Sequence, residues 1–136
     1  MSGSASGYVF HFNYQSETCN GTNGQLNQSV SGSTLLASSD INSGPDFALL
    51  LMTSNIPDSY NPFYVGWSRS SSPPQEAVGI HHPGADIKKI SFDYNNASNS
   101  GNYWDVDSWD DGTTEPGSSG SPLFDGSSQR IIGQLY

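Results

Sequence analysis

The chain has 136 residues, a length that fits one domain with a modest core. Its formal net charge of −9, from 4 Lys and Arg against 13 Asp and Glu, argues against nucleic-acid and anionic-membrane partners and permits attraction of a basic substrate. Low overall charge, 15 Gly and 8 Pro are typical of a turn-rich, secreted all-β protein.

Two further features bear on location. No apolar run reaches membrane-spanning length, and residues 1–7 contain neither a basic nor an apolar region, so we expect no export signal in this sequence. The single cysteine, Cys19, cannot form an internal disulfide.

The first part of the chain reads as strands separated by polar loops. Residues 8–14 alternate aromatic with other residues at period two, which predicts a strand with one buried face. Residues 17–29 form a long polar loop, and residues 33–37 a short strand. Residues 46–52 are the most apolar run and predict a central strand, with Asp46 at its mouth.

The second part follows a connector at residues 55–62 and a flexible link at residues 68–75. We expect its strands at residues 63–67, 77–82, 87–94, 103–106 and 130–136. A tight hairpin at Pro83-Gly84 separates the second strand from the third, and residues 95–102 are a low-complexity loop. Because no segment has capped apolar residues at helical spacing, helix content should be small.

Residues 115–124 read Glu-Pro-Gly-Ser-Ser-Gly-Ser-Pro-Leu-Phe, a small-residue turn that leads into an apolar strand. A serine becomes a nucleophile only where a base can take its proton and backbone N–H groups converge on the oxyanion. Gly117 and Gly120 allow positive φ and close approach of a substrate, while Pro116 and Pro122 fix the ends of the turn. The competing interpretation is an ordinary Gly/Ser loop.

The pattern G-x-S-G-x-P before an apolar strand resembles the nucleophile loop of trypsin-like serine proteases. TEPGSSGSP followed by a strand with IGQL resembles the lysyl endopeptidase branch of that superfamily. The resemblance extends through further segments, in order: FNYQ at residue 12, SGST at 31, DFALL at 46, GW at 66, IHHP at 80 and KKIS at 88.

This resemblance implies an all-β fold of the trypsin-like antiparallel β-barrel type, truncated in this chain. Residues 1–54 would be the remnant of the first barrel, with the Asp46 strand, and residues 55–136 most of the second barrel, in a single compact unit. It further implies a secreted bacterial serine endopeptidase without a cofactor. In the family, the cysteine of this segment pairs with one near the mature N-terminus, which is missing here.

The same resemblance assigns site residues. Ser119 matches the nucleophile, Asp46 the triad carboxylate, and the amides of Gly117 and Ser119 the oxyanion hole. The family's catalytic histidine lies in a segment that this sequence does not contain, so the chain alone is expected to be inactive. His81 and His82 match a His-His-Pro segment that does not hold the base; we interpret them as structural and consider them only as substitutes.

The expected substrate specificity follows only from the resemblance to the lysyl endopeptidase branch. In trypsin, the carboxylate that selects basic residues lies six positions before the nucleophile, where this chain has Thr113. In lysyl endopeptidases, the pocket charge comes from a segment beyond the strand that matches residues 130–136. Cleavage after lysine is therefore an expectation, and the partner would be a polypeptide substrate.

Two alternatives remain open. Residues 104–111 interleave carboxylates with Trp104 and Trp109, so the chain could be a non-catalytic module that binds carbohydrate or calcium on a protease scaffold. Their spacing departs from the calcium-loop template, which favours a solvated acidic loop without a metal. The other alternative is a small β-sandwich with an accidental resemblance. Because a truncated barrel leaves strand edges open, we also expect self-association or pairing with a complementing segment.

Overall fold

The computed structural model describes residues 4–19, 21, 23–42 and 44–136. The start of the chain that we examined for an export signal falls partly outside these ranges, at residues 1–3. The chain is all-β, with antiparallel strands and short 3₁₀ turns, and it forms two compact units, Met1–Phe63 and Tyr64–Tyr136. Within the described ranges, no helix is both long and apolar enough to cross a membrane.

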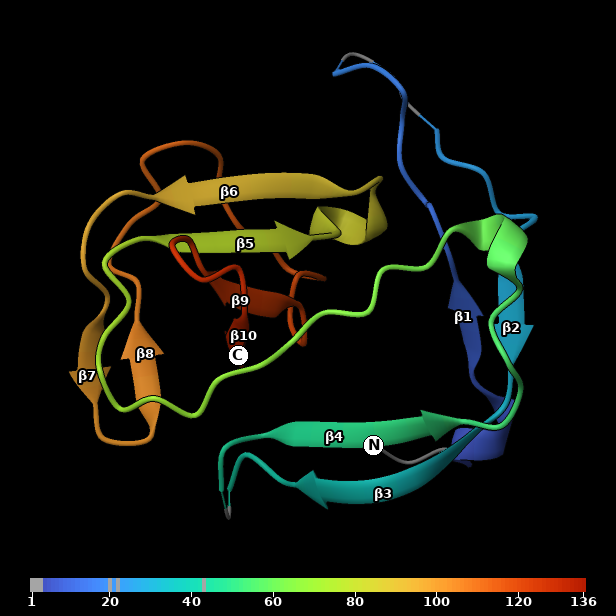
Figure 1. The fold of residues 1–136 in the computed structure, drawn as a ribbon, viewed down its shortest axis with the longest axis horizontal. Coiled ribbons are helices and arrows are strands. Elements are labelled where there is room, and N and C mark those ends of the chain that lie inside the picture. Colours follow the sequence, from blue (N-terminus) through green and yellow to red (C-terminus); the bar gives the residue numbers. More distant parts are fainter. Residues whose placement is uncertain (1–3, 20, 22, 43) are drawn as a thin grey trace. The chain divides into compact units, whose positions relative to one another are not determined.

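Unit 1 contains two antiparallel strand pairs (Figure 1). Its elements are η1 (Ala5–Gly7), β1 (Val9–His11), β2 (Ser29–Ser31), β3 (Ser33–Ser39), β4 (Phe47–Met52) and η2 (Asp58–Tyr60). Strand β1 pairs with β2, with Phe10 opposite Val30, which is the buried apolar residue of this pair. The expected half-buried strand is confirmed but is shorter than residues 8–14, because the chain leaves the sheet beyond His11 and enters the long polar loop.

The apolar strand β4 is not a central strand, so that prediction is wrong. In the described residues it pairs only with β3, through a register that shifts between Leu35 and Ala37. Leu49 and Leu51 remain 55% and 57% exposed. Apolarity alone identified the strand, but the number of its neighbours depends on pairing partners elsewhere in the chain.

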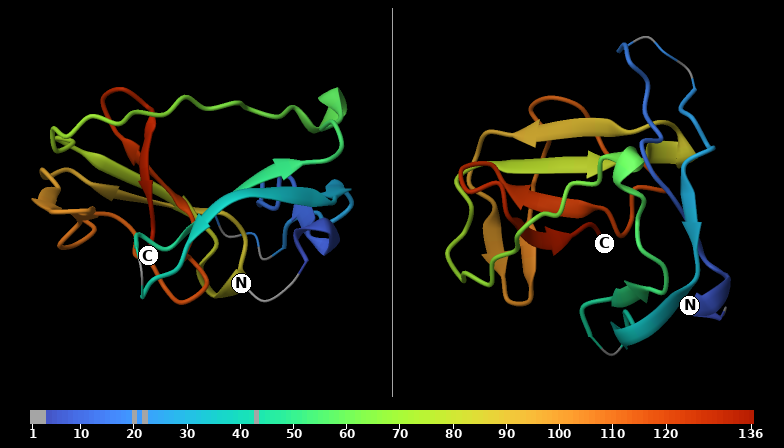
Figure 2. Two further views of the ribbon diagram at one scale, coloured as in Figure 1. Left: turned by 90° about the horizontal axis from the view of Figure 1, so that it is seen from below. Right: turned by 45° about the vertical axis from the view of Figure 1, so that its right-hand side comes forward.

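Unit 2 contains a four-stranded antiparallel sheet in the order β10-β9-β5-β6 (Figures 1 and 2). Its elements are β5 (Ala77–His81), η3 (Pro83–Ala85), β6 (Lys89–Asp93), β7 (Ser98–Ser100), β8 (Tyr103–Asp105), β9 (Pro122–Asp125) and β10 (Ile131–Gln134). Strand β5 is central and alternates buried with half-buried residues, which places Ala77, Gly79 and His81 on its buried face. In the described part of the chain, no sheet closes into a barrel.

Two local predictions for unit 2 are wrong. Residues 63–67 do not form a strand: Trp67 makes a single bridge to Ile131, and Phe63, the last residue of unit 1, is 89% exposed. The segment 95–102, predicted as a loop, contributes β7, which pairs with β8. Gly101, with φ of 73°, provides the left-handed residue that this hairpin turn needs, a cue masked by the polar composition.

Candidate functional site

Two consecutive turns form the loop at residues 115–121. The amide of Ser118 donates to the carbonyl of Glu115 at 3.0 Å, and the amide of Ser121 donates to the carbonyl of Ser118 at 3.1 Å. The third positions are Gly117 and Gly120, with φ of 99° and 82°. Positive φ at the third position, after proline in the first turn, is the geometry of type II turns. Ser118 is therefore the residue that the two turns share, and we call residues 115–121 the double turn.

The double turn contains two amides without an acceptor in the described part of the protein, those of Gly117 and Ser119. Each points away from the hydrogen bond that the carbonyl of its own peptide group accepts. The carbonyl of Pro116 accepts a hydrogen bond from the amide of Gly84 at 2.8 Å, and the carbonyl of Ser118 accepts from Ser121. In a planar trans peptide, the N–H points opposite to the C=O, so these bonds fix where the amides of Gly117 and Ser119 point. Among the described residues, neither amide has an acceptor. Two such donors could hold a negatively charged oxygen.

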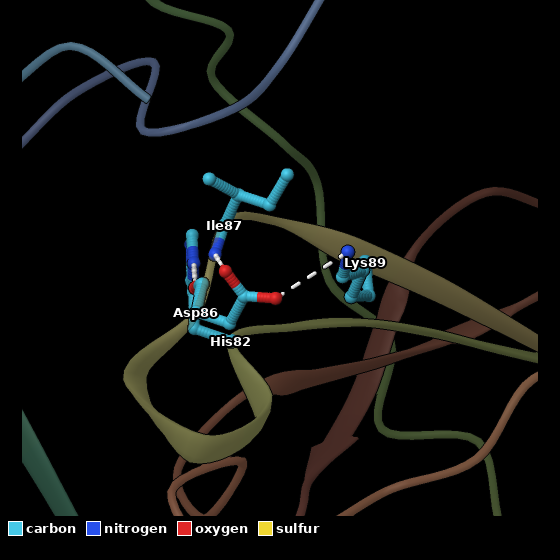
Figure 3. A network of polar contacts seen from close by, with 4 residues as sticks. All are labelled: His82, Asp86, Ile87 and Lys89. Carbon is cyan, nitrogen blue, oxygen red and sulfur yellow. Dashed lines mark hydrogen bonds and ion pairs between the residues drawn. The ribbon is translucent and has the colours of Figure 1, made fainter. Parts of the chain in front are cut away.

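A network of polar contacts lies in the corner after β5 (Figure 3). The carboxylate of Asp86 accepts from the amide of Ile87 at 2.7 Å and lies 3.5 Å from Nζ of Lys89, while Nδ1–H of His82 donates to the carbonyl of Asp86 at 2.9 Å. The Ile87 amide, with a smaller contribution from Lys89, lowers the pKa of Asp86. These contacts stabilise the corner. The corner carries Gly84, whose amide donates to the carbonyl of Pro116 in the double turn.

The two adjacent serines of the double turn have opposite environments. Ser118 is completely buried, whereas Ser119 is exposed. In the described structure, the hydroxyl of Ser119 has no hydrogen-bond partner, so it is available to a reactant. The sequence pattern had already favoured Ser119 over its neighbours.

His81 lies at the end of β5 and is only 1% exposed. Its Nδ1 lies 2.9 Å from Oγ of Ser118, and its Nε2 lies 3.0 Å from Oγ of Ser91. Burial, followed by repulsion from His82, lowers its pKa, against an opposing effect of Glu115. Both ring nitrogens of His81 are therefore engaged within unit 2, and neither engages Ser119.

Asp46 directly precedes β4 in unit 1, whereas the double turn belongs to unit 2. It is exposed, and its φ of 41° places it in the left-handed region that aspartate adopts more readily than most residues. Asp46 follows Pro45 and lies immediately before the first residue of β4.

A cleft of about 480 Å³ lies beside the double turn, lined by the corner at η3, by β6 and by Gly112, Thr113 and Glu115. Its charged lining groups are Asp86, Lys89 and Glu115. Thr113, six positions before Ser119, lines the same cleft.

The acidic segment at residues 104–111 is used in local contacts. The hydroxyl of Tyr94 donates to Asp111 at 2.8 Å, and the amide of Tyr94 donates to Asp110 at 2.8 Å. The ring of Trp109 covers Gly79, where a β-carbon would lie 3.0 Å from the indole. Within the described ranges, no group of three or more His, Cys, Asp or Glu side chains is arranged to hold a metal ion.

Sequence reasoning did not identify the supporting residues Gly84, Ser91 and Ser118. Their roles come from contacts between segments far apart in the chain, such as the 3.0 Å contact of Ser91 with His81. One signal was available: His81 follows Ala77 and Gly79 at period two, so it had to share their face.

One comparison with known families covers the whole sequence. Residues 1–136 match the family model described as "Lysyl endopeptidase, C-terminal domain". The match includes both the Asp46 strand in unit 1 and the double turn in unit 2.

Proposed function

The chain belongs to the lysyl endopeptidase C-terminal domain family, and on this premise we propose that it carries the nucleophile and the oxyanion donors of a serine endopeptidase. Ser119 attacks the carbonyl carbon of a peptide bond, and the amides of Gly117 and Ser119 hold the oxyanion of the tetrahedral intermediate. The leaving amine departs to give an acyl-enzyme, which water hydrolyses. The substrate is a polypeptide cleaved after lysine, outside the cell.

One observation supports this proposal most strongly. The exposed hydroxyl of Ser119 lies in the same turn system as two unused amides whose directions are fixed by bonds to Gly84 and Ser121. Both residues that carry these amides are exposed, so the amides and the hydroxyl are accessible to the same substrate carbonyl. Preorganised donors of this kind lower the barrier of acyl transfer because they need no rearrangement during the reaction.

The general base in this proposal is a histidine from outside residues 1–136. His81 is engaged with Ser91 and Ser118, and His82 donates to the carbonyl of Asp86. Without the imidazole of that external histidine, Ser119 reacts slowly, because the oxyanion donors alone supply only part of the catalysis.

The test is intact-mass analysis after exposure to a fluorophosphonate probe, with free imidazole added as a soluble base. We expect slow modification of the chain alone and faster modification as neutral imidazole increases. Ser119→Ala should abolish the modification, and the matched variant Ser121→Ala should retain it. Modification that persists in Ser119→Ala, or a folded sample that imidazole never activates, would overturn the proposal.

A further inference from the structure

The buried imidazole of His81 connects two serines that come from different parts of unit 2. Ser91 lies on β6 and Ser118 in the double turn, and both side chains are completely buried. A buried polar ring is costly unless both nitrogens have partners. Here both contacts are short, at 2.9 Å to Ser118 and 3.0 Å to Ser91.

The direction of each hydrogen bond follows from counting protons. The hydroxyl of Ser91 donates to the carbonyl of Thr113 at 3.2 Å, so its single proton is used and it accepts from Nε2–H of His81. The neutral ring then has an unprotonated Nδ1, which accepts the hydroxyl proton of Ser118. Oγ of Ser118 in turn accepts a longer contact from the amide of Glu115 at 3.4 Å. Every donor in this series of hydrogen bonds, from Glu115 through Ser118 and His81 to Ser91, has an acceptor.

Ser118 occupies the position where its side chain has most influence on the double turn. Its amide closes the first turn and its carbonyl closes the second. The residues on either side, Gly117 and Ser119, carry the two unused amides. Fixing the hydroxyl of Ser118 therefore restrains the rotation of both turns and of both amides.

We propose that His81 is a positioning residue for the double turn: as the neutral Nε2–H tautomer, it holds the hydroxyl of Ser118 and so keeps the amides of Gly117 and Ser119 directed at the substrate. The importance for the reaction rests on the proposed function, whereas the restraint on Ser118 does not. His81 acts through Ser118 and touches neither the substrate nor Ser119.

The chain offers a matched pair of variants. The side-chain amide of Asn reaches the position of Nδ1, and that of Gln reaches the position of Nε2. His81→Asn should keep the acceptor for Ser118 and lose the contact with Ser91, and His81→Gln should do the reverse. Ser118→Ala removes the restrained hydroxyl itself.

The measurements are made on the full chain by NMR and need no catalysis. Long-range ¹H–¹⁵N spectra should show His81 as the Nε2–H tautomer. Native-state amide exchange at positions 118 and 121 should be about tenfold faster in His81→Gln and in Ser118→Ala, the effect of one lost buried hydrogen bond. His81→Asn should stay within about threefold of the parent, because it retains that bond. Amides of β7 and β8 report general destabilisation.

The Nδ1–H tautomer would contradict the proposal, and so would equal exchange in His81→Asn and His81→Gln, whether both are perturbed or both unchanged. Faster exchange in β7 and β8 to the same extent would show a general structural role and also overturn it. Failure of Ser119 to react with the fluorophosphonate leaves all these readouts intact, so the two proposals fail separately.

Discussion

Gly84 donates its amide to the carbonyl of Pro116 at 2.8 Å, and this contact joins the corner after β5 to the double turn. The approach is so close that a β-carbon on Gly117 would lie 3.2 Å from the amide nitrogen of Gly84. Such a contact is with backbone, which cannot rotate away as a flexible side chain can.

Gly117→Ala should therefore destabilise the protein more than Gly120→Ala. Both residues have positive φ, which costs an alanine about 1 kcal/mol, but a β-carbon at Gly120 meets nothing within 4 Å. For Gly117→Ala the added backbone contact raises the loss to about 2–4 kcal/mol. Urea unfolding monitored by tryptophan fluorescence measures both. Equal losses for the two variants would mean that the corner and the double turn do not press on each other.

A second prediction concerns stability below pH 6.5, the ordinary pKa of histidine. Burial lowers the pKa of folded His81, so between pH 6.5 and that lower value the unfolded chain binds more protons than the folded one. The free energy of unfolding should decline as the pH falls, by at most about 1.4 kcal/mol per pH unit. The charged groups around the ring are His82, Glu115 and Lys89, the residue opposite His81 on β6.

His81→Asn should remove this slope, since the other two histidines remain in both proteins. Urea midpoints between pH 5 and 8 for parent and variant provide the comparison. A slope that survives in the variant would assign the acid sensitivity to other groups.

The sequence was most informative where local pattern determines the structure. Strands β5, β6 and β10 lie within segments predicted as strands, and β9 is the strand predicted to follow the small-residue turn. Runs of β-forming residues bounded by Gly and Pro are local signals, so the sequence alone indicates them. The pattern around Ser119 also indicated two glycines with positive φ, which the structure contains. Contacts between segments far apart in the sequence could not be predicted. No local pattern relates His81 to Ser118 or indicates how many strands pair with β4.

A third prediction concerns the acidic segment. The hydroxyl of Tyr94 donates to Asp111, and this hydrogen bond, together with the nearby negative charges, raises the pKa of Tyr94 above 10.0. Asp111→Asn keeps an acceptor but removes a charge, so it should move that pKa back toward 10.0. The tyrosine ring signals, followed by NMR from pH 9 to 12 and assigned with Tyr94→Phe, measure the change. Because the neutral form is favoured in the folded state, Tyr94 should reduce stability as the pH rises above 10.

An unchanged titration of Tyr94 in Asp111→Asn would contradict this account. A calcium-binding segment behaves differently: calcium would displace the proton of Tyr94 from Asp111 and lower that pKa. Repeating the parent titration with calcium chloride separates the two, and we expect no effect of calcium.

The last prediction is self-association through the exposed face of β4. Leu49 and Leu51 point to the same side of a two-stranded sheet, and Leu36 on β3, at the register shift, is also about half exposed. Completing the burial of one such side chain gains up to about 1.5–3 kcal/mol, and a sheet of two strands is marginal by itself. The net charge of −9 opposes contact between copies, so association should strengthen as salt screens the charge.

Sedimentation velocity at low and high salt tests this prediction. The double variant Leu49→Gln/Leu51→Gln should shift the distribution toward monomer, whereas Ser38→Gln, an exposed polar position on β3, should leave it unchanged. A parent chain that sediments as a monomer at every salt and protein concentration would show that these leucines do not drive association. An equal shift in Ser38→Gln would show that the effect is not specific to the exposed leucines and would overturn the prediction.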